Sequence, residues 1–431
     1  MIDLVQLRHE PDVVKAALAR RGVSVAEVDE VMALDVEHRR LLQEAEKLRA
    51  EVKELSRQVG EARRNNDGAT ATALSATSRD LGDEERLVSR STDEVAARLR
   101  DLLLMLPNLP DERAPDGIDE NDNVELRRWW PRMDEGAEFP TFADHQRVPH
   151  WEIGQALGIL DMESGAKIAG SMFSLYRGAG ARLVRALTSF AMNHHVDAYE
   201  EIRPPSLALT ETMMATGHLP KSADDMYAVE RDGLWAIPTG EVPLTSLRRG
   251  EILQEAELPV RLTAQTSCFR REAGAAGKDT RGLLRVHEFE KVELFAYCTP
   301  TQANDAHADI LRRAEELLRE LGLTYRLLNL CAGDLGSASA YTIDLEVFSP
   351  GVDRWLEVSS VSWFRDYQAR RANVRFRTSD GSITLVHTVN GSALAWARIW
   401  AALVETYRQE DGSIRLPDAL APYMGSDAVI R

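Results

Sequence analysis

The sequence is poor in cysteine and has no long apolar run, and each shortage excludes a class of protein. Its three cysteines, Cys268, Cys298 and Cys331, are far apart and form no Cys-x-x-Cys pair. We therefore expect no disulfide framework and no zinc, but reduced thiols in a cytoplasmic protein. Apolar stretches such as 102–106 are far shorter than the roughly 20 residues that cross a bilayer. Residues 1–11 lack the apolar core of a secretion signal.

Basic residues are also in short supply. The 431 residues include 52 Lys and Arg against 69 Asp and Glu, a formal net charge of −17. Non-specific nucleic-acid binding depends on Lys and Arg that neutralise phosphates, so this charge excludes a generic DNA binder. It does not exclude a local surface for one defined RNA, because a net charge averages over the whole chain.

Two familiar nucleotide-binding motifs are missing. No G-x-G-x-x-G follows an expected strand, so a dinucleotide-binding fold has no support. The stretch 274–279 resembles a phosphate-binding P-loop only faintly, because Glu272 stands where glycine is required and Asp279 replaces Ser or Thr. A nucleotide site in this chain would have to be built from other residues.

The strongest pattern in the sequence is a heptad repeat. Between 31 and 59, mostly apolar residues recur at alternating steps of three and four, which is typical of a coiled-coil seam. Turn residues at 65–68 interrupt the repeat, and apolar residues then recur every seven over 74–102. We expect weaker partner positions there, such as Thr77 and Glu84. The two stretches predict an antiparallel helical hairpin, with a dimerisation rod as the alternative.

The character of the sequence changes after an acidic, Pro-containing connector at 107–123. Helical stretches then alternate with short β-branched and aromatic runs, such as 341–348, 355–361 and 372–377. Several runs alternate apolar with polar residues, the period-two pattern of strands with one buried face. We therefore predict an α+β fold, in which the helical hairpin precedes an antiparallel sheet flanked by helices.

Three charged clusters accompany the expected strands, and the first, 266–293, predicts a strand, a glycine-rich loop and a second strand. The loop carries Lys278, Arg281 and Arg285. Arg and Lys around a flexible glycine loop suit a polyphosphate, because their N–H donors match phosphate oxygens. The alternative is a solvated basic hairpin.

The second cluster contributes oxygen ligands. Glu357 and Ser360 are of the kind that Mg²⁺ takes together with phosphates. Residues three apart share a strand face only where the backbone is irregular, so a surface position on the sheet remains the alternative for such an acid.

In the third cluster, we expect Asn390 and Gly391 to end a strand and Ser392 to cap the helix that follows. That helix is apolar apart from Arg398. A lone arginine is costly to bury unless it meets an anion or an acid. A ligand phosphate and a structural salt bridge are the two alternatives.

The order and spacing of these clusters resemble the class II aminoacyl-tRNA synthetases, and in detail the bacterial-type seryl-tRNA synthetases. The resemblance covers nearly the whole chain. It rests on the heptad hairpin and on the fragments MIDLVQLRHEPDVVKAAL, LPNLPDERAPDGIDENDNVELRRW, PTGEVPLTSL, CFRREAGAAGKDTRGLLRVHEFEKVEL, DYQARRANVRFR, VHTVNGSALAWAR and DGSIRLPDALAPYMG. It implies a tRNA-binding domain with a long coiled-coil arm over 1–106, and a class II catalytic domain with the serine site, the ATP site and the dimer interface over 107–431.

The resemblance implies a two-step reaction. L-Serine and ATP would give seryl-adenylate, and the seryl group would then move to the 3′-terminal ribose of tRNA(Ser). Such catalysis depends on positioning and charge neutralisation, without a covalent enzyme intermediate. The implied ligands are serine, ATP with Mg²⁺, and tRNA(Ser) bound by the arm, in a cytoplasmic homodimer that binds neither DNA nor a membrane. The segment 180–205 resembles the family's dimer-forming motif.

Site residues are carried over by the same resemblance. The serine-binding set is Thr239, Glu241, Arg270, Glu293, Asn390 and Ser392. The ATP-binding set is Arg270, Glu272, Arg285, Val286, His287, Glu288, Phe289, Glu357, Val358, Ser359, Ser360 and Arg398. Arg270, Arg398 and Glu357 would be catalytic, and Glu357 and Ser360 would hold Mg²⁺. In these sets, Arg270 clamps the α-phosphate and Phe289 stacks on adenine.

Some residues depart from the family pattern. Glu288 stands where Gln is usual, Ala397 replaces the Gly before Arg398, and Trp396 adds bulk. These departures motivate a variant hypothesis, a specialised second copy that serves antibiotic resistance or a biosynthetic pathway. The alternatives are a ligase that loads an amino acid onto a carrier protein, whose relatives lack the arm, and a non-enzymatic tRNA-binding relative, which should have lost the charged site residues.

Overall fold

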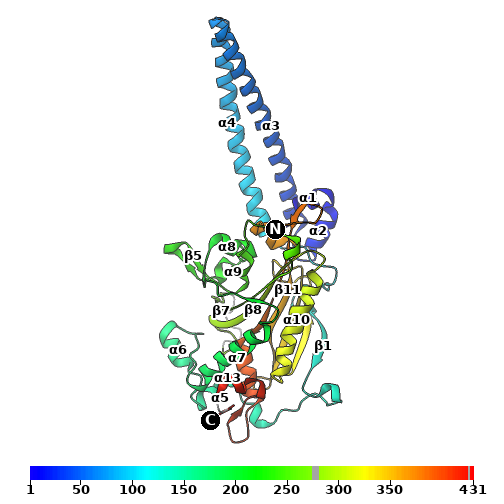
Figure 1. Cartoon of the computed structure of the whole chain (residues 1–431), viewed down its shortest axis with the longest axis vertical. Helices are drawn as coiled ribbons and strands as arrows, with labels where there is room; N and C mark the ends of the chain where they lie inside the picture. The colour runs from blue at the N-terminus through cyan, green and yellow to red at the C-terminus, as the bar shows by residue number, and fades with distance from the viewer. Residues whose placement is uncertain (274–280, 426–427) are drawn as a thin grey trace. The chain divides into compact units, whose positions relative to one another are not determined.

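The computed structural model describes residues 1–273, 281–425 and 428–431, and the chain divides into two compact units (Figure 1). One unit is Ile2–Leu106, and the other is Met1 with Pro107–Arg431. Lys278, expected in a basic loop, lies outside the described residues. Within the described ranges, no helix is both long and apolar enough to cross a membrane.

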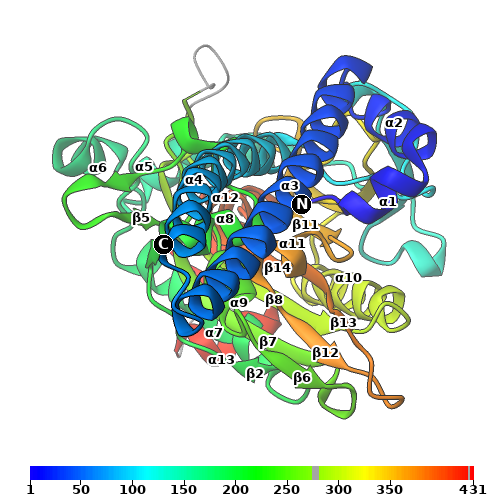
Figure 2. The same cartoon turned by 90° about the horizontal axis from the view of Figure 1, so that it is seen from above.

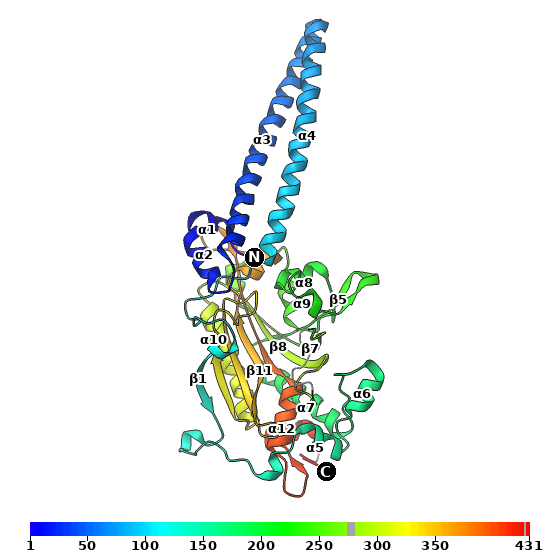
Figure 3. The same cartoon turned by 180° about the vertical axis from the view of Figure 1, so that it is seen from behind.

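The first unit is helical. After two short helices, α1 (Leu4–His9) and α2 (Pro11–Ala19), the long helices α3 (Val25–Arg64) and α4 (Gly68–Met105) run side by side (Figures 1 and 3). At 1.5 Å per residue, each long helix extends for about 60 Å. The predicted hairpin is confirmed, and its helices extend beyond both ends of the heptad stretches.

The hairpin buries the predicted seam, with one correction. Val31, Leu41 and Leu48 of α3 are buried. On α4, however, Thr77 and Glu84 are exposed, and the buried partners of the seam are Thr92 and Leu99, which follow Val88 and Val95 by four residues. The second set of positions that face α3 therefore lies four residues after each residue of the 74–102 repeat. The sequence had predicted it three residues after, at positions such as Thr77 and Glu84.

Local hydrogen bonds fix the turn predicted at 65–68. Asn65 ends α3, and Asn66 adopts a left-handed conformation with φ 57°. The carboxylate of Asp67 then accepts a hydrogen bond from the N–H of Thr70 (3.0 Å) at the start of α4. Short polar side chains of this kind favour turns and helix N-termini, which explains why the hairpin closes here.

The second unit is built on an eight-stranded sheet, antiparallel except for the parallel pair β2 and β7. In sheet order, the strands are β1 (Val124–Trp129), β9 (Tyr325–Asn329), β10 (Tyr341–Ser349), β11 (Arg354–Trp363), β14 (His387–Ala395), β8 (Glu288–Cys298), β7 (Val260–Phe269) and β2 (Glu200–Glu201). This sheet confirms the predicted antiparallel architecture and the strands expected at 341–348 and 355–361.

Helices and smaller strands surround this sheet. The helices are α5 (His150–Ala156), α6 (Met162–Ala169), α7 (Ala179–His195), α8 (Thr210–Thr216), α9 (Glu241–Ser246), α10 (Ala303–Glu320), α11 (Tyr367–Ala372), α12 (Trp396–Thr406) and α13 (Ala421–Met424). The smaller strands are β3 (Leu207–Leu209), β4 (Ala228–Val229), β5 (Leu234–Ala236), β6 (Ile252–Gln254), β12 (Arg375–Arg377), β13 (Ile383–Leu385), β15 (Ile414–Arg415) and β16 (Val429–Ile430). Helix α10 packs on β14 and β11, and α12 packs on β10 and β11.

The strand expected at 372–377 is only half right. Its first residue ends helix α11, and Asn373 then turns the chain in a left-handed conformation (φ 54°). Only β12 is extended. It joins β6 and β13 in a separate three-stranded sheet, seen at the edge of Figure 2.

The end of a strand predicted at Asn390 and Gly391 is wrong, and Ser392 does not cap a helix. Strand β14 continues to Ala395, which precedes α12. Gly391 is needed for packing, because a Cβ there would lie 2.6 Å from a methyl group of Ile310 on α10. Since strand residues alternate between faces, the neighbours of Gly391 point away from α10.

Candidate active site

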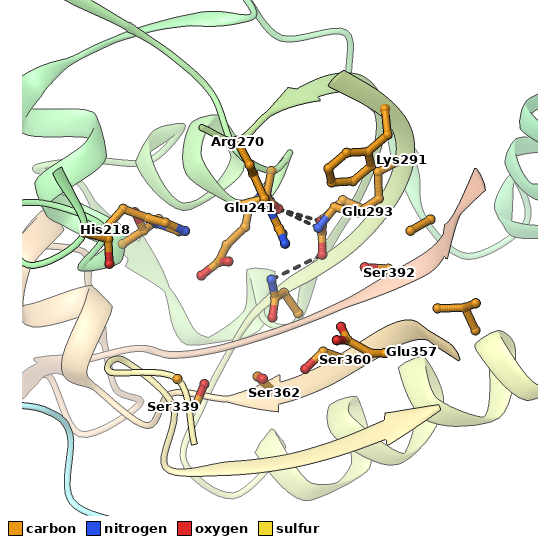
Figure 4. A pocket seen from close by; sticks show the side chains of 18 of the residues that line it. His218, Glu241, Arg270, Lys291, Glu293, Ser339, Glu357, Ser360, Ser362 and Ser392 are labelled. Carbon is orange, nitrogen blue, oxygen red and sulfur yellow. Dashed lines mark hydrogen bonds and ion pairs between the residues drawn. The ribbon is translucent and has the colours of Figure 1, made fainter. Parts of the chain in front are cut away.

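A cavity of about 360 Å³ lies against β8, β11 and β14 (Figure 4). Most of the residues predicted from the sequence line it together. They are Thr239, Glu241, Arg270, Glu272, Arg285, Val286, Phe289, Glu293, Glu357, Val358, Ser360, Asn390, Ser392 and Arg398. The cavity therefore brings together segments from all three charged clusters of the sequence.

Three predicted residues lie next to the cavity without lining it. The ring of His287 packs near Phe173, and its Nδ1 lies 2.9 Å from the carbonyl oxygen of Arg270. Glu288 is exposed at the start of β8. Ser359 is buried, and its hydroxyl donates to the carbonyl of Ser392 (2.6 Å). His287 and Ser359 thus support the backbone on which lining residues stand.

Glu293 is the most heavily bonded acid of the cavity. Its Oε2 accepts hydrogen bonds from Thr239 Oγ1 (2.8 Å) and pairs with Lys291 Nζ (2.5 Å), while Asn390 Nδ2 donates to Oε1 (3.2 Å). Lys291 also donates to Thr239 Oγ1 (2.8 Å). Glu293 is only 1% exposed, and burying a carboxylate is costly. The ion pair and these hydrogen-bond donors offset that cost.

Glu241 is held differently. Gln368 Nε2 donates to its Oε1 over 2.5 Å, and Gln368 Oε1 in turn accepts from the hydroxyl of Thr388 (2.7 Å). Burial raises the pKa of Glu241 to about 7, and the nearby charge of Glu293 adds to this shift. The two acids therefore differ: Glu293 is paired with a cation, whereas Glu241 points into the cavity and pairs with no cation of the part of the chain that the structure describes (Figure 4).

Arginines also line the cavity. The guanidinium of Arg270 lies 5.3 Å from the centre of the Phe289 ring, and among the described residues no carboxylate pairs with it. Arg285 pairs with Glu272. Arg281, expected beside it, is exposed and lines a different cavity. A cation without a carboxylate partner, beside an aromatic face, is available to an anionic ligand.

Arg398 meets an acid and still lines the cavity. Its Nη1 lies 3.7 Å from Glu357 Oε2 and donates to the carbonyl of the same residue (2.8 Å), while Nε donates to the carbonyl of Leu284 (3.1 Å). Ala397 lines the cavity beside it, and Trp396 is buried. The salt bridge, one of the two alternatives for Arg398, is thus present, and the side chain remains 30% exposed.

A β-bulge explains how Glu357 and Ser360 come to share a face. Leu345 of β10 lies opposite Ser359 of β11, but the next residue, Glu346, lies opposite Glu357. Val358 is therefore an extra residue in β11, and an extra residue reverses the alternation of side chains. The condition stated from the sequence, an irregular backbone, is met.

An acid next to this bulge has an unpaired oxygen. Asp344 on β10 lies opposite Ser360, and its Oδ1 is buried without a hydrogen-bond partner among the described residues. Burial raises the pKa of Asp344, and the charge of Glu357 raises it further. The carboxylate of Glu357 is half exposed toward the cavity. Two acids and a hydroxyl are a donor set suited to a hard divalent cation.

Several lining residues have no counterpart among those predicted from the sequence. Lys291 could have been found, because it alternates with Phe289 and Glu293 along one face of β8. His218 has no such signal. Its Nδ1 lies 2.8 Å from Thr216 Oγ1, and burial, with the charges of two nearby cations, lowers its pKa to about 3.

Comparison with known proteins gives two family matches. Residues 1–110 match the seryl-tRNA synthetase N-terminal domain, and residues 227–407 match the class II tRNA synthetase core domain (G, H, P, S and T). A serine–tRNA ligase of Acidithiobacillus ferrooxidans is 46% identical over 433 residues, covering 100% of both chains.

Solved structures agree with these matches. The crystal structure of seryl-tRNA synthetase from Pyrococcus horikoshii complexed with ATP has a TM-score of 0.90 and 34% identity, covering 100% of this chain and 99% of that one. The cytoplasmic serine–tRNA ligase from Naegleria fowleri in complex with AMP has a TM-score of 0.86 and 25% identity, with coverage of 100% and 99%.

Proposed function

Because this chain belongs to the seryl-tRNA synthetase family of serine–tRNA ligases, we propose that its cavity joins L-serine to ATP and then to tRNA(Ser). One observation carries this assignment to the cavity. Two buried acids, Glu241 and Glu293, and three arginines line the same cavity. An amino acid presents a cation and a nucleotide presents phosphates, so a cavity lined by both kinds of charge fits both ligands at once.

The two buried acids would hold serine. The substrate ammonium would meet Glu241, the acid without a cation partner. The substrate hydroxyl would reach Glu293, Asn390 and Ser392, which face the same space. Alanine would leave these buried groups unpaired, and sites built on such groups discriminate strongly against the analogue that lacks the hydroxyl.

The three arginines, together with Phe289 and Glu272, would hold ATP. Phe289 would stack on adenine, and Glu272 would border the adenine pocket. Arg270 would contact both the α-phosphate and the serine carboxylate, while Arg285 and Arg398 would contact the outer phosphates. These cations would draw two anions together and neutralise the charge that builds up between them.

The reaction would then proceed by displacement. A carboxylate oxygen of serine attacks the α-phosphorus, the bond to the β-phosphate oxygen breaks, and pyrophosphate leaves. A hydroxyl of the tRNA's terminal ribose next attacks the seryl carbonyl, and AMP leaves. No residue of the chain forms a covalent bond in either step. The residues contribute position and charge, and Arg270 is placed to act in the first step.

Magnesium fits one side of the cavity. We propose that Glu357 and Ser360 would hold Mg²⁺, because the bulge in β11 turns both toward the cavity and Asp344 adds an acid beneath them. When bound, Mg²⁺ neutralises phosphate charge. Arg398 lies beside Glu357 and would orient its carboxylate.

The helical hairpin would bind the tRNA. The chain carries a net charge of −17, yet residues 34–64 of α3 hold eight Lys and Arg against seven Asp and Glu. This near-neutral stretch would repel RNA less than the rest of the chain does. We therefore assign tRNA binding to 1–106 and catalysis to 107–431.

A homodimer interface would form around α7 and β2, within 180–205. The ring of His195 at the end of α7 is buried, and neither nitrogen has a partner among the described residues. Val196, the next residue, is 69% exposed. A second copy packed here would cover this apolar side chain. We place the homodimer in the cytoplasm, where its tRNA substrate would be found.

An ATP–pyrophosphate exchange assay with a panel of amino acids tests the first step. We expect exchange with serine and little with alanine, threonine or glycine. Exchange without charging of tRNA(Ser) would favour the carrier-protein ligase. Absence of serine-dependent exchange would contradict the proposal and favour a non-enzymatic tRNA-binding relative.

A further inference from the structure

A fully buried histidine–carboxylate pair lies beside one wall of the cavity, and the proposed reaction does not use it. His150 begins α5 and Glu405 lies in the last turn of α12. Both side chains have no exposed surface, and neither lines the cavity. The wall in question is the segment 283–286, which does line it.

Four donors fix the carboxylate of Glu405. Its Oε1 accepts from the backbone N–H of His150 (2.9 Å) and lies 2.8 Å from Nδ1 of the same residue. Its Oε2 accepts from the N–H of Gly351 (3.0 Å) and from the hydroxyl of Ser349. A carboxylate with this many donors has one orientation, so it also fixes the imidazole that faces it.

The imidazole passes this orientation on to the cavity wall. Because Nδ1 faces a carboxylate oxygen, it donates, and Nε2 is then the acceptor of the ring. The N–H of Leu283 lies 2.9 Å from Nε2 and donates to it. His150 therefore connects the end of α12 to the backbone of the wall.

The same helix reaches the wall a second time. Arg398 Nε donates to the carbonyl of Leu284 (3.1 Å), and positions 398 and 405 lie two turns apart on one face of α12. The wall is thus held at the N–H of Leu283 by His150 and at the carbonyl of Leu284 by Arg398. Gly282 permits this close approach, because a Cβ there would lie 2.4 Å from His150 Nε2.

We propose that His150 is a positioning residue for ATP, which sets the segment 283–286 so that its Arg285 and Val286 meet the nucleotide. This inference rests on the proposed function. It assigns to the pair a role in nucleotide binding, beyond that of packing α5 against α12. The residues proposed to bind serine belong to other elements, since Glu241 begins α9, Glu293 lies on β8 and Asn390 lies on β14.

Two substitutions at His150 separate this role from a structural one. In His150→Asn, the amide nitrogen takes the place of Nδ1 and still donates to Glu405, but nothing reaches Leu283. In His150→Gln, the amide oxygen takes the place of Nε2 and accepts from Leu283. Each removes one hydrogen bond at the same buried place, so we expect similar losses of thermal stability.

Serine-dependent ATP–pyrophosphate exchange is the measurement. We expect the KM for ATP to rise about tenfold in His150→Asn and to stay within about threefold of the parent value in His150→Gln. The N–H of Leu283 loses its buried acceptor only in His150→Asn, and the loss of one such hydrogen bond is large enough to account for this difference. The KM for serine should stay unchanged in both. Equal KM values for ATP in the two variants, or an equal rise in the KM for serine, would overturn the inference.

Controls keep the result interpretable. Tyr407→Phe removes the hydrogen bond to the carbonyl of Leu321 (2.9 Å) just beyond α12, and it should lower stability without changing the KM for ATP. If neither His150 variant folds, Gly282→Ala replaces them, because its Cβ displaces the imidazole. An unchanged KM for ATP in Gly282→Ala would overturn the inference. Absence of exchange in the parent protein would instead overturn the proposed function.

Discussion

The side-chain amide of Gln368 donates to Glu241 over 2.5 Å, and so fixes the orientation of the acid that we assign to the serine ammonium. Thr388 holds the amide from its other side. Gln368 would therefore affect serine binding through Glu241, without contacting the substrate itself. The charge of Glu241 and its direction are both set by this neighbour, by burial and by the acid Glu293.

Serine binding should therefore depend on pH. Burial raises the pKa of Glu241 to about 7, and the charged groups that line the same cavity around it are Glu293, Lys291 and Arg270. Because the ammonium needs the carboxylate, the KM for serine should rise as the pH falls below 7, by about tenfold per pH unit. In Glu241→Gln, the KM for serine should be high and nearly independent of pH. A pH profile of the exchange reaction between 5.5 and 8.5 measures this.

Replacement of Gln368 by Leu moves that profile. The amide stabilises the ionised form of Glu241, so its loss should raise the pKa of this acid further. The limb of the profile should shift to higher pH, and the KM for ATP should not change. A profile identical to that of the parent protein would show that Gln368 does not orient the acid.

Glu241 should also make the free protein less stable at alkaline pH. Its pKa lies above the ordinary value of 4.5, so its contribution to stability is fully present below pH 4.5 and is lost as the pH rises through about 7. Glu241→Gln removes this loss and should raise the free energy of unfolding at pH 8 by about 3 kcal/mol. Thermal melts at pH 5 and pH 8 test this, and we expect little difference at pH 5.

Loss of the buried cation Lys291 should be costly. Lys291→Met leaves the buried Glu293 without its ion-pair partner, and breaking a buried pair in this way typically costs about 3–5 kcal/mol. We expect a lower melting temperature together with a higher KM for serine. The double variant that also carries Glu293→Gln should recover stability but not serine binding. If the double variant were less stable than Lys291→Met, the pair would not be the unit described here.

The two units should divide the labour. Replacement of residues 30–100 by a short linker removes most of α3 and α4 but leaves the cavity residues untouched, because all of them belong to the other unit. Exchange should be retained and charging of tRNA(Ser) should fall by orders of magnitude. Parallel loss of both activities, in a protein that still melts cooperatively, would contradict this division.

Features set by local sequence were predictable. The heptads of α3 and the alternating runs of β10 and β11 carry their periodicity within about ten residues, so hairpin and sheet followed from them. The strand end predicted at Asn390 and Gly391 is wrong, because Asn-Gly is typical of a turn, whereas here the glycine makes room for α10. Local pattern cannot distinguish a turn from a close approach of another element.

The support of the site was not predictable from local pattern. Gln368 meets Glu241 across 127 positions of sequence, and His150 meets Leu283 across 133. The bulge at Val358 depends on the partner strand as much as on its own residues. Most residues that line the cavity were predicted from the resemblance to a family. The residues that hold them in place were identified only from the structure.

The central claim is that this chain charges tRNA(Ser) with serine, and aminoacylation measures it most directly. The full-length protein is incubated with labelled serine, ATP, Mg²⁺ and a tRNA(Ser) transcript, beside a transcript that lacks its 3′-terminal nucleotide. We predict ATP-dependent, acid-precipitable label on the intact transcript alone, and its loss in Arg270→Ala. No label on tRNA(Ser), or equal label in Arg270→Ala, would contradict the account.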